Sequence, residues 1–576
     1  MCGITGYYGN KNMGKYLYNS LKRLDYRGYD SAGIATLNNG KINIKKDTGE
    51  VEQINQKHNL EKTDGKIGVG HTRWSTHGST TKQNAHPHLS CDERFAIAHN
   101  GIIENWKDLK SQLNGHRYTS ETDSEVIAHY IEEKSKEMSV EEAVKKFFKE
   151  AKGSLAVVLL DSKEEKMYAF KRGSPLALGI GNDETFLGSD LYAFSTETDK
   201  AIFFEDDEYG IIDQTGYVIK NINGEEVEKE PENFDWDQEE AGKEGYEHYM
   251  RKEIGEIPQA VERLENSLNS AQEKQVDRFV ELIKNHEKIL FTASGTSYHA
   301  SLMGVYFLNK ADIEAQTLIA SEFKNYERVD EDTLVIAISQ SGETKDVLDA
   351  MEYSRKEGAD IASIINVPYS SVERESDVSL RIMAGQEVCV AATKTFINQI
   401  YTLLKIANKL GYQNHLEEIP KRIEKVIEKN EPKIKQLAKE LKNKNDIYII
   451  GRGDTYPIAR EIALKLKEIP YIHAEGMMGG ELKHGTLALI EEDVPVISLI
   501  PEKNSEIISN VKEIEARNAK SIKISPWTGP FKFPNSNSKF PFYTIIIGFL
   551  LSYWIANEKN LPIDRPRNLS KSITVS

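Results

Sequence analysis

The second residue of the chain, Cys2, is the first candidate for chemistry. Removal of Met1 would leave Cys2 with a thiol and a free α-amino group on one residue. An α-amino group has a pKa of about 7.7–8.0, so part of it is unprotonated near neutral pH. It could take the thiol proton itself, which predicts a nucleophile that needs no separate histidine. An ordinary frayed terminus can begin in the same way, so other residues must support this interpretation.

Three short segments supply the groups that an amide-hydrolysing cysteine needs: residues 70–78 (GHTRWSTHG), 99–105 (HNGIIEN) and 119–125 (TSETDSE). Attack on a carboxamide creates an oxyanion, which the Asn100 side-chain amide and the Gly101 backbone N–H can stabilise. A free amino-acid substrate also needs an arginine for its carboxylate and an aspartate for its ammonium group. Taken singly, Arg73 could form a surface ion pair, Asn100-Gly101 a turn, and Asp123 a helix cap.

Together with residues 26–33 (YRGYDSAG) and 84–88 (NAHPH), these segments resemble the N-terminal-nucleophile class of glutamine amidotransferases. The resemblance implies that Cys2 is the nucleophile and that Asn100 and Gly101 form the oxyanion hole. It also implies a set of residues that hold glutamine or support its site: Arg73, Trp74, Thr76, His77, Asp123 and, in support, Arg27.

From about residue 246 the pattern changes to apolar strands, each followed by a turn and a helix. The expected strands are 288–292, 333–338, 361–365, 446–450 and 494–500. This alternation predicts doubly wound α/β domains with mostly parallel sheets. Residues 289–298 and 447–456 resemble each other, with Gly295 falling on Gly453, which suggests two copies of one fold. The alternative is that all strand–glycine–helix units look alike.

Two polar loops in the first copy suit a phosphate group: residues 294–297 (SGTS) and 339–344 (SQSGET). Each loop follows an expected strand and leads into an expected helix. Hydroxyl groups and backbone N–H groups at a helix N-terminus favour binding of an anion. Two capped helix starts would look the same, but two such loops in one sheet favour a ligand site.

Glu461, Lys465 and Glu468 are spaced to share one face of a predicted helix. On an unknown helix this spacing would indicate a surface salt-bridge ladder. Here residues 480–485 (GELKHG) follow, and a carboxylate and a histidine near a phosphate suit proton transfer at a sugar carbonyl. The tail 564–575 would by itself be interpreted as an ordinary solvated end.

From Cys2 to the tail, the order of these parts resembles the order found in the family of isomerising glutamine–fructose-6-phosphate aminotransferases. Members of this family act in the first step of hexosamine biosynthesis. The resemblance implies that Lys571 forms a Schiff base with open-chain fructose 6-phosphate and that Glu468 moves a proton between sugar carbons 1 and 2. It implies that His484, from a neighbouring subunit, helps to open the ring. It further implies a set of sugar-phosphate-binding and supporting residues: Ser297, Ser339, Gln340, Ser341, Thr344, Val390 and Ser570, with Glu461 and Lys465 in support.

The same resemblance implies that ammonia passes through an internal channel beside Trp74, away from water. The sequence departs from the family pattern at Ala392, where the family usually has Ser, and at Arg565, where Gln is common. Two alternatives stay open: an amidotransferase that acts on another ketose phosphate, and a sugar-phosphate sensor without catalysis. A sensor would be expected to lack Glu468, His484 and Lys571.

Composition limits the partners and the compartment. The net charge of −16 makes nucleic acid and anionic membrane unlikely partners. The three cysteines, Cys2, Cys91 and Cys389, form no close pair and show no zinc-like spacing, which indicates a reducing cytoplasm and no disulfide framework. We expect no metal and no organic cofactor. The apolar stretch 543–556 is short for a membrane span and predicts a buried helix.

With 576 residues, the chain is expected to form several domains. We predict an α+β glutaminase domain at 1–225, an αββα sandwich of the N-terminal-nucleophile hydrolase type, and an acidic linker at 226–246. Two doubly wound α/β sugar isomerase domains follow at 247–414 and 415–576. Within the last domain, Pro420 and Pro432 are expected to break a Lys/Glu-rich helical stretch. The expected partners are L-glutamine, D-fructose 6-phosphate and at least one further copy of the chain, because a site shared between subunits requires at least a dimer.

Overall fold

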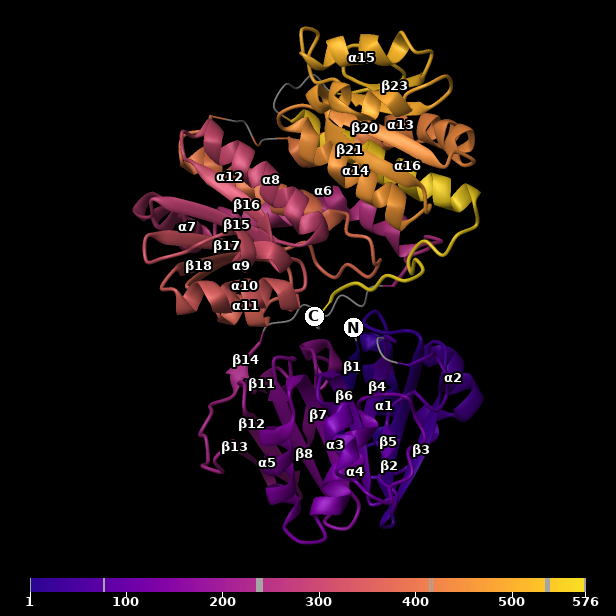
Figure 1. The fold of residues 1–576 in the computed structure, drawn as a ribbon, viewed down its shortest axis with the longest axis vertical. Coiled ribbons are helices and arrows are strands. Elements are labelled where there is room, and N and C mark those ends of the chain that lie inside the picture. The colour runs from indigo at the N-terminus through magenta and orange to yellow at the C-terminus, as the bar shows by residue number, and fades with distance from the viewer. Residues whose placement is uncertain are drawn as a thin grey trace. The chain divides into compact units, whose positions relative to one another are not determined.

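The structure, a computed structural model, describes residues 2–75, 78–234, 242–413, 416, 418–533 and 539–573. Its contacts divide the chain into two units, Met1–Glu240 with Ser570–Ser576, and Ala241–Leu569 (Figure 1). The division falls inside the predicted linker 226–246. Strand β14 (Glu232–Asn233) pairs with β11 (Lys200–Phe203), so the first part of that linker belongs to the first unit.

Two antiparallel sheets form the centre of the first unit. The order of the eight-stranded sheet is β14, β11, β9 (Ala177–Ile180), β10 (Thr185–Gly188), β1 (Gly3–Tyr8), β4 (Ile67–Arg73), β2 (Ser31–Asn38) and β3 (Lys41–Thr48). The order of the six-stranded sheet is β13 (Gly216–Asn221), β12 (Glu208–Asp213), β8 (Lys166–Arg172), β7 (Gly153–Asp161), β6 (Phe95–Ile103) and β5 (His88–Leu89). Buried side chains of both sheets, such as Val69 and Val158, form one apolar cluster between them.

Helices cover the two outer faces of this sandwich. Helix α1 (Met13–Leu24) packs on β1 and β4, with α2 (Val51–His58) and η1 (Leu60–Lys62) beside it. On the other face lie α3 (Trp106–Ser111), α4 (Glu125–Lys134) and α5 (Val140–Glu150), whose apolar side chains form a second cluster with β6–β8. A short turn, η2 (Leu191–Ala193), follows β10. This arrangement confirms the predicted αββα sandwich.

The second unit contains two parallel sheets. The first has the order β16 (Ala315–Ile319), β15 (Lys288–Ala293), β17 (Thr333–Ser339), β18 (Asp360–Ile365) and β19 (Val378–Arg381). The second has the order β21 (His473–Met478), β20 (Asp446–Gly451), β22 (Pro495–Leu499) and β23 (Lys520–Ile524). In both sheets the first strand of the copy lies between the second and the third. Gly295 and Gly453 follow these first strands with φ of 57° and 54°, which agrees with two copies of one doubly wound fold.

The helices of this unit flank the two sheets. They are α6 (Tyr249–Leu268), α7 (Glu273–Asn285), α8 (Gly295–Lys310), η3 (Ala320–Glu322), α9 (Phe323–Tyr326), α10 (Lys345–Lys356), α11 (Ser371–Arg374), α12 (Lys394–Lys409), α13 (Ile419–Leu441), α14 (Thr455–Glu468), η4 (Gly479–His484), η5 (Thr486–Leu489), α15 (Ile507–Glu515) and α16 (Phe540–Glu558). One apolar cluster extends from α6 through both sheets to α16, so the two isomerase copies share a continuous core.

Helix α13 corrects one prediction, because Pro432 lies inside it and does not break it. Pro420 lies in the first turn, where no intrahelical N–H bond is lost. At Pro432 the lost hydrogen bond costs about 3 kcal/mol. The apolar face of α13, including Ile423 and Ile434, is fully buried and packs against α16 and α6, and this burial offsets the cost.

Helix α16 confirms the expected buried helix. It is apolar and long enough to cross a membrane, but 89% of its most apolar window is buried inside the unit. It packs against α13 and α14, and a Cβ atom at Gly548 would approach Ile462 to 2.4 Å. A helix covered on all sides by its own chain has little apolar surface to offer to lipid.

Candidate active sites

Cys2 lies directly before β1, which pairs with β4 and places the thiol beside the end of that strand. The Cys2 Sγ atom accepts a hydrogen bond from the Trp74 N–H at 3.3 Å. Burial raises the pKa of the Cys2 thiol, and the Trp74 N–H and the Arg73 charge oppose that rise only in part. The thiol at this position therefore needs a base to become a nucleophile.

Strand β6 carries the two predicted oxyanion-hole residues to the same place. The Asn100 Nδ2 atom donates a hydrogen bond to the Cys2 carbonyl oxygen at 3.0 Å. Gly101 has φ of 123°, and a Cβ atom there would lie 2.1 Å from the Ser154 carbonyl oxygen on β7. Only glycine fits this backbone conformation and this close approach.

His71, on β4, orients Asn100, although the sequence assigned it no role. Its Nε2 atom lies 3.1 Å from Asn100 Oδ1 and 3.0 Å from the His99 carbonyl oxygen. Burial lowers the pKa of His71 to about 3, so the ring is neutral. Because both partners are acceptors, the proton is on Nε2, and the Asn100 amide is turned with its N–H₂ toward Cys2. The only signal in the sequence was the position of His71 next to Thr72 and Arg73 in the first motif.

Arg73 and Asp123, the predicted anchors for an amino acid, are both buried. The Arg73 guanidinium interacts electrostatically with Cys2 and with Asp123. Asp123 is held by the Ile103 N–H, which donates to its Oδ2 atom at 2.7 Å. The Trp74 ring packs edge-on against Tyr29 at a centroid distance of 5.2 Å. The predicted residues Thr76 and His77 lie outside the described residues.

Arg27 supports this site through the fold. Its guanidinium forms a buried ion pair with Asp190, which also accepts a hydrogen bond from the Tyr26 hydroxyl at 2.8 Å. The same loop carries Asp30, whose Oδ2 atom accepts from the Ser75 N–H at 2.9 Å. The ion pair therefore braces the loop that holds the backbone next to Trp74.

In the second unit, the predicted phosphate loops follow β15 and β17, at the point where the strand order reverses. Ligands of doubly wound sheets bind in the crevice at this switch point. The Ser339 and Ser341 Oγ atoms accept hydrogen bonds from the Gly342 and Glu343 N–H groups at 3.0 and 3.2 Å, and Thr344 is the N-cap of α10. The Ser297 Oγ atom accepts from Gln399 Nε2 at 2.9 Å. Gln340 lies between Ser339 and Ser341 in the loop.

Glu461 and Lys465 are fully buried, which excludes the surface ladder that their spacing alone would suggest. The Lys465 Nζ atom lies 3.3 Å from Glu461 and 2.6 Å from Glu468. Burial lowers the pKa of Lys465, but the two carboxylates outweigh that effect and the net shift is upward. This ammonium group therefore stays charged and fixes Glu468.

Two residues of α8 complete this network, and the sequence did not indicate them. The Thr296 hydroxyl donates to Glu461 Oε1 at 3.0 Å, and His299 Nδ1 lies 2.7 Å from Glu461 Oε2. Helix α8 belongs to the first isomerase copy and α14 to the second. The charged network therefore connects α8 of the first copy with α14 of the second copy, next to the predicted phosphate loop at residues 294–297.

The whole chain was compared with known proteins. It is 41% identical to the glutamine–fructose-6-phosphate aminotransferase (isomerising) of Methanococcus maripaludis and 41% identical to that of Thermococcus kodakarensis, with 100% of each chain covered in both cases. The chain belongs to this aminotransferase family. Residues 71–196 match the glutamine amidotransferase domain, and residues 281–408 and 440–527 match the SIS domain.

Solved structures agree with this assignment for the second unit. The C-terminal domain of glucosamine-fructose-6-phosphate aminotransferase from Francisella tularensis is 35% identical, with a TM-score of 0.50, and covers 57% of this chain and 100% of that chain. Tagatose-6-phosphate ketose/aldose isomerase from Escherichia coli reaches the same TM-score at 15% identity over 56% of this chain and 96% of that chain, which shows a shared fold alone.

The remaining predicted residues of this aminotransferase lie in loops and at helix ends. Val390 donates its N–H to the Asp564 carbonyl oxygen at 3.1 Å, and the Asp564 carboxylate accepts from the first N–H groups of α6. Glu468 ends α14, and His484 is exposed at the end of η4. Ser570 and Lys571 lie in the last described segment, where the Ser570 hydroxyl donates to the Ser572 carbonyl oxygen at 3.0 Å.

Proposed function

We propose that Cys2 releases ammonia from glutamine in the first domain and that the isomerase domains, with the C-terminal tail, add it to the sugar. As a member of its family, the enzyme transfers the amide nitrogen of L-glutamine to D-fructose 6-phosphate with isomerisation, giving D-glucosamine 6-phosphate and L-glutamate. The observation that carries the division of labour is the contact of Asn100 with Cys2, because it brings an amide donor from the matched amidotransferase segment, residues 71–196, beside the N-terminal cysteine.

In the glutaminase step, the amino group freed by removal of Met1 takes the thiol proton of Cys2. The raised pKa of the buried thiol supports this need for a base. The thiolate attacks the carboxamide carbon, and the Asn100 side chain and the Gly101 N–H stabilise the oxyanion. Ammonia leaves with the proton returned by the amine, and water then releases glutamate from the thioester. Arg73 and Asp123 bind the carboxylate and the ammonium group of glutamine, beside Trp74, Thr76 and His77.

In the sugar step, the phosphate group binds between Ser297 and the loop of Ser339, Gln340, Ser341 and Thr344. Val390 and Ser570 are the two further residues that we propose for sugar-phosphate binding. The Lys571 amine condenses with the sugar carbonyl at carbon 2 and water leaves. Ammonia then displaces Lys571 from this carbon, and Glu468 moves a proton from carbon 1 to carbon 2. The short contact between Lys465 and Glu468 supports this role, because it holds the carboxylate in one orientation.

We further propose that the enzyme is at least a homodimer in the cytoplasm. The expected role of His484 in opening the sugar ring of a neighbouring subunit requires a second copy, and its exposure leaves it accessible to one. All three cysteines are free, which suits a reducing compartment. Sedimentation of the purified enzyme tests the first statement: a monomer at working concentration would contradict it.

Product analysis tests the proposed division of labour. Wild-type enzyme given glutamine and fructose 6-phosphate should form glucosamine 6-phosphate and glutamate in equal amounts. Cys2→Ala should form neither product from glutamine. Lys571→Ala should still release glutamate but form no amino sugar, which separates the two steps. Amino sugar from Cys2→Ala with glutamine, or undiminished amino sugar from Lys571→Ala, would show that these residues do not have the proposed roles.

A further inference from the structure

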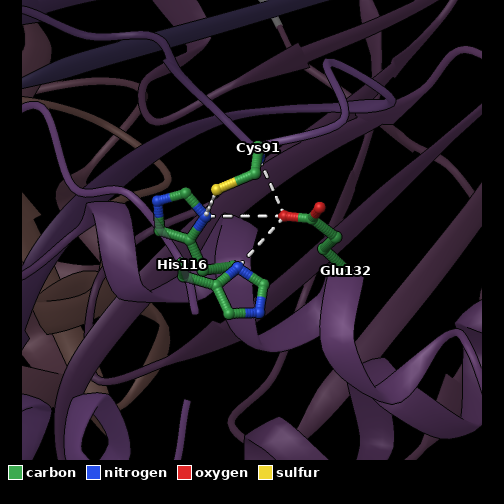
Figure 2. A group of neighbouring side chains, drawn as sticks. Cys91, His116 and Glu132 are labelled. Carbon is green, nitrogen blue, oxygen red and sulfur yellow. Dashed lines mark hydrogen bonds and ion pairs between the residues drawn. The ribbon is translucent and has the colours of Figure 1, made fainter. Parts of the chain in front are cut away.

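A second group of reactive side chains in the first unit has no part in the proposed amidotransfer. Cys91, His116, His129 and Glu132 each offer one ligand atom, and these atoms all lie within 4.8 Å of one another. Figure 2 shows Cys91, His116 and Glu132 turned toward one another. The four residues come from three separate segments: the turn after β5, the loop between α3 and α4, and α4 itself.

The separations within this group have the lengths expected around a tetrahedral metal ion. Zinc binds sulfur at about 2.3 Å and nitrogen or oxygen at about 2.0–2.2 Å, so neighbouring ligand atoms lie roughly 3.3–3.6 Å apart. Here Glu132 Oε2 lies 3.3 Å from His116 Nδ1 and 3.5 Å from His129 Nδ1. The Cys91 Sγ atom lies 3.6 Å from His129 Nδ1. Three of the six distances between the four ligand atoms therefore already match those around a tetrahedral zinc ion.

Each imidazole has a carboxylate behind it. His116 Nε2 forms a hydrogen bond of 3.0 Å with Glu133 Oε2, whereas His129 Nε2 lies 3.6 Å from Glu125 Oε1, which is an ion-pair separation and longer than a hydrogen bond. A carboxylate on the far nitrogen is the usual arrangement for a metal-bound histidine, because it fixes the tautomer and aims the other lone pair at the ion. The His116 Nδ1 atom, which faces the centre of the group, is buried and makes no hydrogen bond among the described residues.

The two anionic ligands are held in place by backbone N–H groups. Glu132 accepts hydrogen bonds from the Cys91 N–H at 2.8 Å and from the Asp92 N–H at 3.1 Å. The Cys91 Sγ atom accepts from the Arg117 N–H at 3.2 Å. A thiolate and a carboxylate together neutralise a divalent cation, so the loaded site would carry no net charge in its half-buried position.

We propose that Cys91, His116, His129 and Glu132 bind one zinc ion. The mixture of sulfur, nitrogen and oxygen ligands suits zinc, and four protein ligands fill a tetrahedral shell with no position for water or substrate. The site is therefore structural. It ties the turn after β5 and the loop after α3 to α4, and the exposed Cys91 leaves a path for the ion to enter.

Metal analysis of untagged full-length enzyme tests the proposal. After dialysis against a weak chelator, the wild type should retain one zinc ion per chain by mass spectrometry, and Cys91→Ser and His129→Gln should retain none. Cys389→Ala and His58→Gln are matched controls, since they remove a thiol and a carboxylate-paired histidine elsewhere, and both should retain the ion. Wild-type enzyme with no more zinc than Cys91→Ser would overturn the proposal.

Two further measurements keep the test valid if a ligand variant folds poorly. In cobalt-loaded wild type, a thiolate-to-cobalt charge-transfer band should be present, and a spectrum without it would exclude Cys91 as a ligand. Glu133→Gln changes a side chain behind the site and should fold normally by circular dichroism. It should weaken zinc binding about 10–100-fold in competition with a chromophoric chelator. An unchanged affinity would overturn the assignment of His116.

Discussion

Replacement of His71 by phenylalanine isolates one contact in the glutaminase site. His71→Phe keeps a ring that can stack on His86, whose centroid lies 4.1 Å away, but removes the Nε2–H group. That group is shared between Asn100 Oδ1 and the His99 carbonyl oxygen. The variant therefore leaves the Asn100 amide in place and removes what fixes its orientation.

The size of the effect follows from that single shared hydrogen bond. A neutral hydrogen bond contributes about 0.5–1.5 kcal/mol, which corresponds to roughly a 2- to 12-fold preference for the active orientation of the amide. We therefore expect kcat for glutamate release to fall by about this factor, with little change in KM for glutamine. Complete loss of an oxyanion donor costs about 10²–10³ in kcat, which is the upper limit for His71→Phe. The two unpaired acceptors should also lower stability by about 1–3 kcal/mol.

A double-mutant cycle with Asn100→Ala tests the reasoning, with glutamate release as the assay and circular dichroism as the check on folding. If His71 acts through Asn100, His71→Phe should cause no further loss in the Asn100→Ala background. His58→Gln, a matched change of a histidine on α2, should leave kcat unchanged. Equal losses from His71→Phe in both backgrounds would show that His71 acts independently of Asn100, and the argument would be wrong.

Three other predictions concern stability and the sugar step. Burial lowers the pKa of His71 and of three histidines near it, His86, His88 and His99. Because the unfolded chain binds these protons below about pH 6.5, the first unit should lose up to about 1.4 kcal/mol per pH unit for each histidine as the pH falls. Urea-dependent proteolysis mapped to first-unit peptides measures this loss, and a flat profile between pH 6.5 and 5 would contradict it. Gly101→Ala should abolish most glutamate release and cost more than about 1 kcal/mol of stability, because its Cβ atom would collide with Ser154; near-normal kcat would contradict this. Lys465→Met should destabilise the second unit by about 3–5 kcal/mol and leave glutamate release unchanged, because it removes the buried cation beside Glu461 and leaves that carboxylate with Thr296 and His299 as partners. Adding Glu461→Gln to Lys465→Met should restore part of the lost free energy of unfolding. If the losses of the two single variants simply add in the double variant, Lys465 and Glu461 do not act as an ion pair.

The fold was predictable wherever the pattern along the chain is local. The expected strands 288–292 and 361–365 lie within β15 and β18. Both are set by short runs of apolar residues, which neighbouring positions in the chain supply. The break expected at Pro432 failed because packing of α13 against α16 outweighs a local cost. Propensity is a weak guide where a helix has a large apolar face to bury.

The candidate active site was predictable residue by residue but not in its supporting contacts. Motifs indicated Cys2 and Asn100, and β1 and β6 bring the two together. The partner of Glu461 could not be inferred in the same way, because Thr296 and His299 lie in the other isomerase copy, more than 160 residues earlier. A side chain that acts through a spatial neighbour leaves no recognisable pattern in the sequence, because only the fold defines which residues are neighbours.

The proposed zinc ligands extend this argument to a whole site. Zinc motifs are recognised by pairs of ligands a few residues apart, since one turn or hairpin then presents both. Only His129 and Glu132 have such spacing here, and one turn of a helix with a histidine and a glutamate is common in surface helices. Cys91 and His116 reach the same point only because the turn after β5 and the loop after α3 both pass the second half of α4, where His129 and Glu132 lie. The sequence-based expectation of no metal therefore depended on contiguous spacing, a criterion that does not apply when three segments of a folded domain each contribute ligands.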